Sequence, residues 1–373
     1  MLLIALGIAF CSFVLCFYSI PILVKLANRF NIYDQPNHIK KHKRKITFLG
    51  GAAILFSFLI PLSLLLPAEI KKPIYLNSYL ILMVIIFFHG LGDDIFNYNP
   101  SKKFLIQGLL CGLLIYKTGL YIPFENMLDG WQLPSIVYVM LTLLAAMAVV
   151  NAYNLIDGSD GLAASISLIA GLFYAFYFFM DGNYFFFIAA LGISASLLAF
   201  LLYNRPPAHI FMGDSGSLFI GMLLATFTFV FIENKTGAAG LSTSNRVILA
   251  FSFLSIPILD MVRLFIVRSY GGRNPFKGDN NHIHHLMENI GFTTKQTLLI
   301  ITTFQLLNIG IAYLALNKSW IGFILISICV YTFLIQSLRQ LKTYLSHRDV
   351  KTINPTADSN EEGTTFERNV KVS

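Results

Sequence analysis

The stretch ILMVIIFFHGLGDDIFNYNPSKK, residues 81–103, contains an apolar run that ends in two adjacent aspartates, Asp93 and Asp94. Two ionised carboxylates side by side repel each other, and this repulsion is poorly screened beside an apolar segment. Aspartates at the C-terminal end of a helix also oppose the helix dipole. We therefore interpret the pair as one that needs a nearby cation or a shifted pKa, and not as an ordinary helix end.

Similar apolar runs extend along most of the chain. Of the 373 residues, 56% are hydrophobic and 12% are charged, whereas soluble domains contain about 25% charged residues. A helix that crosses the hydrocarbon core needs about 20 apolar residues. The sequence therefore predicts an all-α polytopic integral membrane protein. Its eleven expected transmembrane helices cover residues 2–24, 48–66, 78–92, 104–119, 134–150, 161–180, 184–203, 215–232, 244–268, 296–316 and 319–341.

The Lys and Arg residues predict the orientation, because they are enriched in cytoplasmic loops. With the N-terminus outside and the C-terminus cytoplasmic, only six of the 27 basic residues lie in outer segments: Lys71, Lys72, Lys117, Lys235, Arg246 and Lys318. The net charge of +8 is thus explained by basic residues in cytoplasmic segments of a membrane protein, and we expect no nucleic acid partner. Residues 1–345 are expected to form a single transmembrane domain. Residues 346–373 contain few apolar side chains and are expected to be a disordered cytoplasmic tail.

Three further polar islands would share the cytoplasmic face with Asp93 and Asp94. NAYNLIDGSDGLA (151–163) contains Asn151, Asn154, Asp157 and Asp160 at steps of three, which share one face of a helical turn. In NRPPAHIFMGDSGSLFIG (204–221), Asp214 directly precedes an apolar run. Its position suits a helix cap, and equally a metal ligand beside backbone N–H groups that receive phosphate.

The last island, GGRNPFKGDNNHIHHLM (271–287), carries three histidines, His282, His284 and His285. Together with Arg273 and Lys277 they form a cationic group that suits pyrophosphate recognition. Zinc is not the first interpretation, because neither Cys nor an HExxH pattern accompanies them. The acidic islands instead favour magnesium, which prefers oxygen ligands and keeps water and substrate phosphates in its shell.

In combination, the motifs DD after a span, NxxNxxDGxDGLA, NxxxxxxxMGDxGSxxxG and HxHH resemble one family. It is the polyprenyl-phosphate N-acetylhexosamine-1-phosphate transferase superfamily, glycosyltransferase family 4, and the resemblance covers residues 1 to about 340. The HIHH form resembles the branch that uses UDP-N-acetylglucosamine. Two positions depart from the family's pattern: Asn97, where some members have a third Asp, and Thr47, where Pro is usual.

The resemblance implies a phosphotransferase of the bacterial inner (plasma) membrane with a cytoplasmic active site. Such an enzyme transfers sugar-1-phosphate, here GlcNAc-1-phosphate, from a UDP-N-acetylhexosamine to undecaprenyl phosphate and releases UMP. This step initiates cell-envelope polysaccharide synthesis, including lipopolysaccharide O-antigen and cell wall polymers. The expected cofactor is Mg²⁺, with Mn²⁺ as the alternative, and a homodimer is compatible with the resemblance.

The candidate site combines the residues of the four islands. The acids expected in catalysis are Asp93, Asp94, Asp157 and Asp160, and the expected metal ligands are Asp214 and Asn154. By the motifs and the same resemblance, the residues expected to bind substrate are Asn151, Asn154, Asn204, Phe211, Arg273, His282, His284 and His285.

Three alternatives stay open. The first is the same reaction with another UDP-N-acetylated sugar. The second is a CDP-alcohol phosphotransferase, which DGSDGLA partly resembles, although Gly161-Leu162 replaces the Ala-Arg that this family requires. The third is a cation-coupled transporter, whose acids should lie at mid-span. Only Asp260 lies there, and we interpret Asp260 and Arg263 as a structural pair.

Overall fold

The computed structural model describes residues 1–33, 45–68, 70, 76–123, 134–233, 240–274 and 281–353. This part of the chain is helical and contains no β-strand. Its helices are α1 (Leu2–Phe30), α2 (Gly50–Leu65), α3 (Leu76–Phe96), α4 (Pro100–Thr118), α5 (Ser135–Ile156), α6 (Leu162–Met180), α7 (Tyr184–Asn204), α8 (Gly213–Glu233), α9 (Thr243–Tyr270), α10 (Ile283–Ile290), α11 (Thr294–Leu314) and α12 (Trp320–Ile353).

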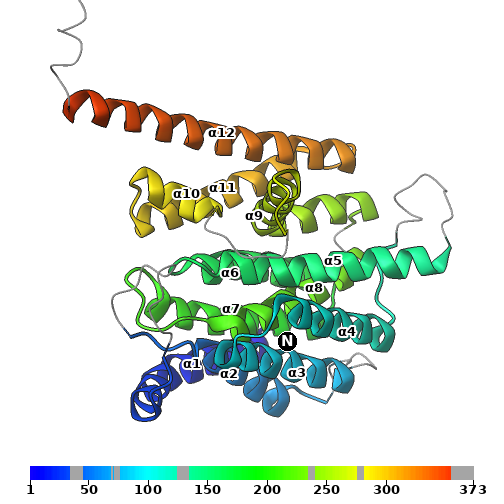
Figure 1. Ribbon diagram of the computed structural model, residues 1–373. Coiled ribbons are helices and arrows are strands. Elements are labelled where there is room, and N and C mark those ends of the chain that lie inside the picture. The colour runs from blue at the N-terminus through cyan, green and yellow to red at the C-terminus, as the bar shows by residue number, and fades with distance from the viewer. Residues whose placement is uncertain are drawn as a thin grey trace, which may run out of the picture.

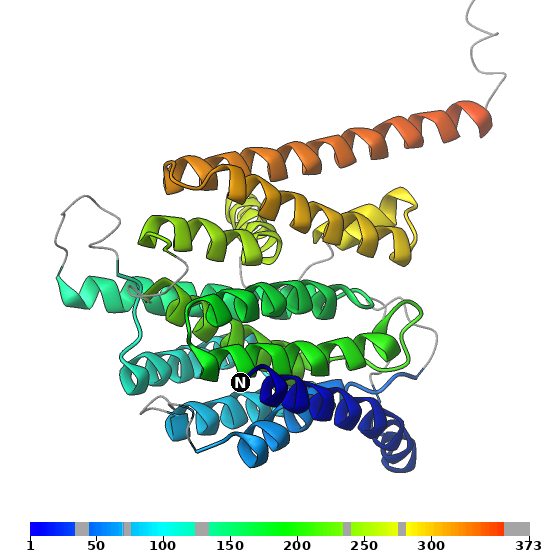
Figure 2. The same ribbon diagram turned by 180° about the vertical axis from the view of Figure 1, so that it is seen from behind.

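Each predicted apolar run corresponds to one helix, and the short α10 is an addition. Nine of the described helices, all except α2, α4 and α10, are long and apolar enough to cross a membrane. The prediction of an all-α polytopic membrane protein is thereby confirmed, whereas the count of eleven spans and the orientation stay predictions. In Figures 1 and 2 most helices lie side by side in one direction, whereas α9, which contains Pro257, changes direction along its length.

Helix α8 lies at the centre of the bundle, because every residue of its most apolar window is buried. It packs against α2, α3, α5, α6 and α9. Its N-terminal end begins Gly-Asp-Ser-Gly-Ser, and these small residues allow neighbouring backbones to approach closely. A Cβ atom at Gly90 of α3, for example, would clash with the carbonyl group of Asp214. The sequence thus places Asp214 at a helix end that several helices surround.

The N-terminal end of α8 is also tied to α2 through backbone hydrogen bonds. Gly50 N–H donates to the carbonyl of Phe211 at 3.0 Å, and Gly51 N–H donates to Met212 at 2.9 Å. Phe211 N–H donates in return to the carbonyl of Thr47 at 2.9 Å. The MGD segment is therefore held in place before α8 begins.

A buried ion pair joins helices at the opposite end of the bundle. Arg246 of α9 donates to both carboxylate oxygens of Asp181, which follows α6, at 2.5 and 2.9 Å. Arg246 is 1% exposed and also donates to the carbonyl of Phe231 at 3.1 Å. A buried Arg needs such partners, because burying an unpaired charge is costly. This pair fixes α6, α8 and α9 to one another at the end of the bundle opposite the N-terminal end of α8.

The C-terminal part of α12 extends to Ile353, beyond the predicted end of the last span. Residues 354–373, most of the predicted tail, lie outside the described residues, as does Lys277.

Candidate active site

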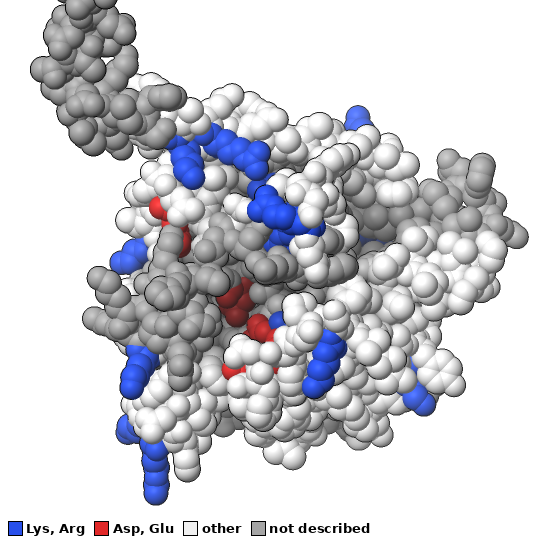
Figure 3. All heavy atoms as spheres, in the orientation of Figure 1, with Lys and Arg blue, Asp and Glu red and all other residues white. Residues whose placement is uncertain are grey.

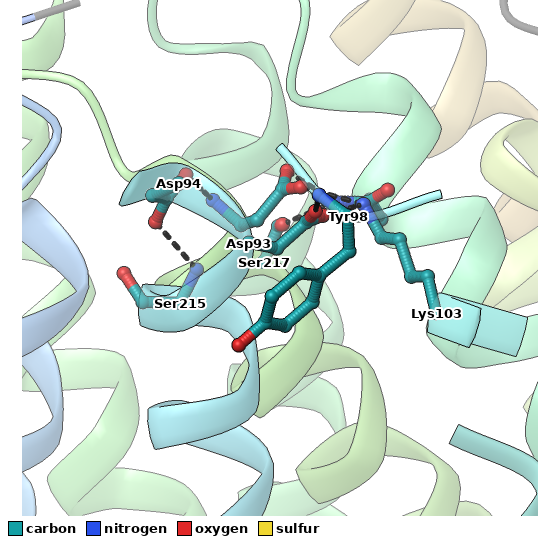
Figure 4. A network of polar contacts seen from close by, with 8 residues as sticks. Asp93, Asp94, Tyr98, Lys103, Ser215 and Ser217 are labelled. Atoms are coloured by element: carbon teal, nitrogen blue, oxygen red, sulfur yellow. Dashed lines mark hydrogen bonds and ion pairs between the residues drawn. The ribbon is translucent and has the colours of Figure 1, made fainter. Parts of the chain in front are cut away.

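Asp93 and Asp94 lie at the C-terminal end of α3, beside the N-terminal end of α8. The Asp94 carboxylate accepts the backbone N–H groups of Asp214 at 2.8 Å and Ser215 at 3.0 Å (Figure 4). These N–H groups belong to the first turn of α8 and have no partner within their own helix. Asp94 is therefore a helix cap supplied by another helix, and it fixes the backbone of Asp214.

Gly213 makes this arrangement possible. Its φ angle is +73°, a left-handed conformation that favours glycine, and a Cβ atom there would lie 2.8 Å from Asp94 Oδ2. The turn before α8 thus brings the two N–H groups onto the Asp94 carboxylate.

Lys103, in the first turn of α4, joins the other two carboxylates. Its Nζ atom lies 2.6 Å from Asp93 Oδ2 and 2.5 Å from Asp214 Oδ2. The second oxygen of Asp93 accepts the Tyr98 N–H at 2.8 Å, as Figure 4 also shows. An acid at a helix C-terminus and a lysine at a helix N-terminus each oppose their own helix dipole. The pairing of Asp93 with Lys103 offsets both costs.

The Asp214 carboxylate is more open to its surroundings than that of Asp93. Its side chain is 32% exposed, against 7% for that of Asp93. Asn154, near the end of α5, donates from Nδ2 to Asp214 Oδ1 at 2.7 Å and to Ser217 Oγ at 3.0 Å. Asn154 thus orients Asp214 toward the opening of the site.

The carboxylates of this group fit a magnesium site that is completed by water and substrate phosphates. Among the described residues, no three His, Cys, Asp or Glu side chains form a ready-made metal cage. Magnesium usually binds through one or two carboxylates together with waters and substrate phosphates. The Asp214 carboxylate, with Asp93 on the other side of Lys103, supplies oxygens for such a shared site.

The loop after α5 holds two of the predicted acids. Asp160 Oδ2 accepts the Ala208 N–H at 2.9 Å, so it joins this loop to the segment that follows α7. Burial raises the pKa of the Asp157 carboxyl well above its ordinary value, and the charges of Asp214, Asp94 and Asp160 raise it further. The surroundings therefore favour the protonated form of Asp157, whereas Asp160 has a fixed structural contact.

The histidines at the start of α10 lie against the loop after α5. A Cβ atom at Gly158 would lie 2.6 Å from Nε2 of His284, which is buried. His284 and His285 are ring neighbours, with centroids 4.2 Å apart, and His282 stacks on His284. The fold thus brings the fourth island next to the second.

Asp260 anchors the histidine segment. Its carboxylate contacts His282 Nδ1 at 3.0 Å and accepts hydrogen bonds from Arg263 at 2.8 Å and from Tyr331 at 2.7 Å. The predicted pair of Asp260 and Arg263 is confirmed, and it also fixes α10 against α9 and α12. A carboxylate on one imidazole nitrogen orients the ring and leaves the other nitrogen to face elsewhere.

The predicted binding residues differ in how far their side chains are already bonded within the protein. Asn151 donates to the carbonyl of Met147 at 2.8 Å within α5. Asn204 accepts the Gly161 N–H at 3.0 Å and donates to the Ile210 carbonyl at 2.8 Å. Arg273 is exposed just after α9. Phe211 is partly exposed beside α2. Their predicted roles in binding stay predictions.

Lys103 is the residue of this group that the motifs did not single out. A lysine in the first turn of a helix opposes the dipole, and this was the signal available in the sequence. Figure 3 shows acidic side chains in a hollow of one face of the molecule, with Lys and Arg around it. Acidic oxygens that could hold a cation, a half-buried ammonium group and a nearby histidine cluster form a site that suits a substrate carrying several phosphate charges.

Comparisons with known proteins identify similar chains. Residues 76–232 match the model of the family described as glycosyl transferase family 4. A probable undecaprenyl-phosphate N-acetylglucosaminyl 1-phosphate transferase of Bacillus subtilis (strain 168) is 31% identical over 285 residues, 75% of this chain and 76% of the relative. The undecaprenyl-phosphate alpha-N-acetylglucosaminyl 1-phosphate transferase of Escherichia coli (strain K12) is 29% identical, with 78% of each chain covered. Its namesake in Thermotoga maritima is 28% identical over 79% of this chain and 85% of the relative.

Proposed function

The chain belongs to glycosyl transferase family 4, and from this premise we propose that it transfers GlcNAc-1-phosphate from UDP-GlcNAc to undecaprenyl phosphate. The products would be UMP and a lipid-linked sugar pyrophosphate, the first intermediate of a cell-envelope polysaccharide. The relatives that match most of the chain bear names of this reaction. Family membership also argues against the CDP-alcohol phosphotransferase and the transporter.

One observation carries the proposal: Asp93, Asp94 and Asp214 converge with Lys103 where α3, α4 and α8 end or begin. An acceptor whose phosphate is anchored at a membrane surface can reach helix ends, whereas it cannot reach the middle of a span. The reaction joins an anionic phosphate to a diphosphate, so its main requirements are charge neutralisation and positioning. A group of carboxylates around a lysine, open at Asp214, suits positioning, and with a bound divalent cation it would also provide charge neutralisation.

Asp214 and Asn154 are the residues that would hold magnesium. The metal, when bound, would neutralise the diphosphate and orient it for in-line attack. Asn154 already touches Asp214 Oδ1, so the two side chains lie close enough to act on one ligand. Mn²⁺ has similar ligand preferences and is the alternative.

Lys103 and Asp93 are placed to act on the acceptor. Lys103 bridges two carboxylates, and an incoming phosphate would exchange for one of them as the partner of its ammonium group. Asp93 would accept the proton of a monoanionic acceptor phosphate at Oδ2, the oxygen that Lys103 contacts. The remaining Asp93 oxygen stays bonded to the Tyr98 N–H, which keeps the carboxylate oriented.

The contacts of Asp94 favour direct attack over a covalent aspartyl intermediate. Both oxygens accept backbone N–H groups, so neither is free to act as a nucleophile without releasing the start of α8. We therefore expect wild-type enzyme freed of polyprenyl phosphate to show no exchange of labelled UMP into UDP-GlcNAc. Robust exchange under these conditions would show that a covalent intermediate forms.

The donor would lie toward the second and fourth islands. We propose that Asn204 and Phe211 contact the uracil, and that His282, His284, His285 and Arg273 act on the pyrophosphate and sugar. Asp157 and Asp160 lie between these groups, in the loop that contacts both His284 and Ala208. The side-chain oxygen and nitrogen of Asn204 are already bonded to Gly161 and Ile210. The backbone that Asn204 fixes would therefore contribute to the uracil contact as much as its side chain.

A transfer assay tests the proposal. Membranes with the full-length protein are supplied with undecaprenyl phosphate and radiolabelled UDP-sugars, and butanol-extractable label is counted. We expect label from UDP-GlcNAc, and magnesium chelation should abolish it. Transfer only from another UDP-N-acetylated sugar would support the same reaction with that donor. Failure with every UDP-sugar would contradict the proposed function.

A further inference from the structure

A groove of about 680 Å³ lies at the same end of the bundle as Asp214, near the loop that holds Asp157 and Asp160. It is formed by the beginning of α6, the end of α7 with the segment after it, and the beginning of α11. Leu202, Leu298 and Leu299 line it. Leu202 is 41% exposed and Leu299 is 66% exposed, so the groove opens onto an apolar surface of the bundle.

Three basic side chains border this apolar groove: Arg205, His209 and Lys295. All three are exposed, and no Asp or Glu belongs to the lining. Among the described ion pairs, none includes any of the three. The groove therefore combines an apolar wall with uncompensated positive charge at one end.

This combination matches one class of ligand. An anionic phospholipid has acyl chains for the apolar wall and a phosphate group for the basic residues. Basic pockets between transmembrane helices on the cytoplasmic side bind such headgroups, because the inner leaflet is rich in anionic lipid. A water-soluble phosphate would leave the leucines unmatched. We propose that the groove binds an anionic phospholipid of the surrounding bilayer, with its phosphate against Arg205 and Lys295.

The groove also shares structure with the acidic site. The segment that carries Arg205 and His209 also contains Ala208, whose N–H group bonds Asp160. Gly161, the residue after Asp160, would place a Cβ atom 3.2 Å from Leu298 and 3.6 Å from the Cα atom of Arg205. A bound lipid would therefore stabilise the loop that contains Asp160 and Gly161, and anionic lipid should raise turnover.

Lipid binding to the purified full-length protein tests this inference without relying on the reaction. Phosphatidylglycerol and phosphatidylcholine with the same acyl chains are titrated, and bound lipid is counted by native mass spectrometry. The wild-type protein should bind phosphatidylglycerol more tightly. The Arg205→Gln/Lys295→Gln variant should bind it about 30-fold more weakly, since each basic residue near an anionic surface contributes about fivefold. Arg205→Lys/Lys295→Arg should retain tight binding.

Lys25→Gln/Arg29→Gln is the matched control, because it removes two exposed charges from the C-terminal end of α1. Unchanged binding in this control, with loss in the groove variant at equal thermal stability, supports the site. Equal losses in both variants would indicate general surface attraction and would overturn it. Wild-type binding in the groove variant would do the same. Displacement of phosphatidylglycerol by one equivalent of undecaprenyl phosphate would assign the groove to the acceptor instead.

Discussion

At the scale of single residues, Asp214 is held through three of its groups. Its backbone N–H is bound by Asp94, its Oδ1 by Asn154 and its Oδ2 by Lys103. We expect Asp214→Asn to lower turnover about a hundredfold or more, because a weakly held magnesium would lose a charged oxygen ligand. The fold should persist, since the backbone contact with Asp94 does not involve the side chain. The transfer assay and thermal unfolding measure the two effects, and near-normal turnover at ordinary magnesium would contradict the metal assignment.

Lys103 and its neighbour Lys102 form a matched pair for a second prediction. Lys103 bridges Asp93 and Asp214, whereas the Lys102 ammonium lies 3.9 Å from the centre of the Tyr98 ring. Lys103→Gln should lower turnover about a hundredfold, because it removes a positive charge that offsets two carboxylates and an incoming phosphate. Lys102→Gln should change turnover less than about threefold, since an exposed cation–π contact is worth only about 0.5–1 kcal/mol.

Steady-state kinetics of the two variants over a range of undecaprenyl phosphate concentrations check this prediction. Equal effects of the two substitutions would show that the lysines serve only to attract the membrane surface. They would then be interchangeable anchors whose ammonium groups extend to the membrane surface.

How much of the site could be predicted depended on where each residue's partner lies. The unfavourable position of Asp93-Asp94 at a helix end indicated a nearby cation, and Lys103 is that cation in the structure. The capping of α8 by Asp94 could not be predicted, because Asp94 and Asp214 are far apart in sequence. The same holds for Asp260, whose contacts with His282 and Tyr331 join three helices.

At the scale of elements, the approach of α3 to α8 positions the acids. Gly90 faces the Asp214 carbonyl group, so Gly90→Ala should push the two helices apart and separate Asp94 from its N–H partners. We expect a loss of about 1–3 kcal/mol in stability, typical of overpacking, together with a severe loss of turnover. Gly112→Ala is the control: Gly112 lies within α4 with no atom near a Cβ position, and alanine favours a helix by about 1 kcal/mol.

Thermal inactivation midpoints and transfer rates of the two variants measure this effect. A Gly90→Ala enzyme with wild-type stability would mean that α3 and α8 do not need this close approach. If both variants lost stability equally, the effect would come from loss of glycine in any helix and not from the α3–α8 contact.

The elements themselves were largely predictable, because apolar runs of about 20 residues have few alternatives to a helix. Each predicted run is a helix in the described part of the chain. The short α10 was not predicted, since its eight residues begin inside a polar island and depend on Asp260 for their placement. Which apolar side chains face the core was less predictable: Cys16 and Cys111 are buried, whereas Cys329, also within an apolar run, is exposed on α12. Side chains that face lipid and side chains that face the core are both apolar, so the sequence alone does not distinguish the two environments.

At the scale of the whole molecule, family membership confirms the predicted class of enzyme, a sugar-1-phosphate transferase. The orientation of the bundle still rests on the distribution of Lys and Arg. The structure adds that the acidic site, the histidines and the basic groove occupy one end, whereas Asp181 and Arg246 are buried at the other. Since nucleotide sugars are consumed at the acidic end under our proposal, that end should face the cytoplasm.

The two ends of α11 offer a direct test of orientation. Asn289 lies in α10 before it, and Lys318 lies after it, and both are exposed. Because α11 is long enough to cross a membrane, cysteines at these two positions should lie on opposite sides of it.

In intact cells, Lys318→Cys should react with an impermeant thiol reagent, and Asn289→Cys should react only after permeabilisation. Cys11, Cys16, Cys111 and Cys329 are first replaced, and the cysteine-free enzyme must retain transfer activity. Labelling of Asn289→Cys from outside would invert the topology and would exclude a cytosolic nucleotide donor, even if the carboxylate chemistry were correct.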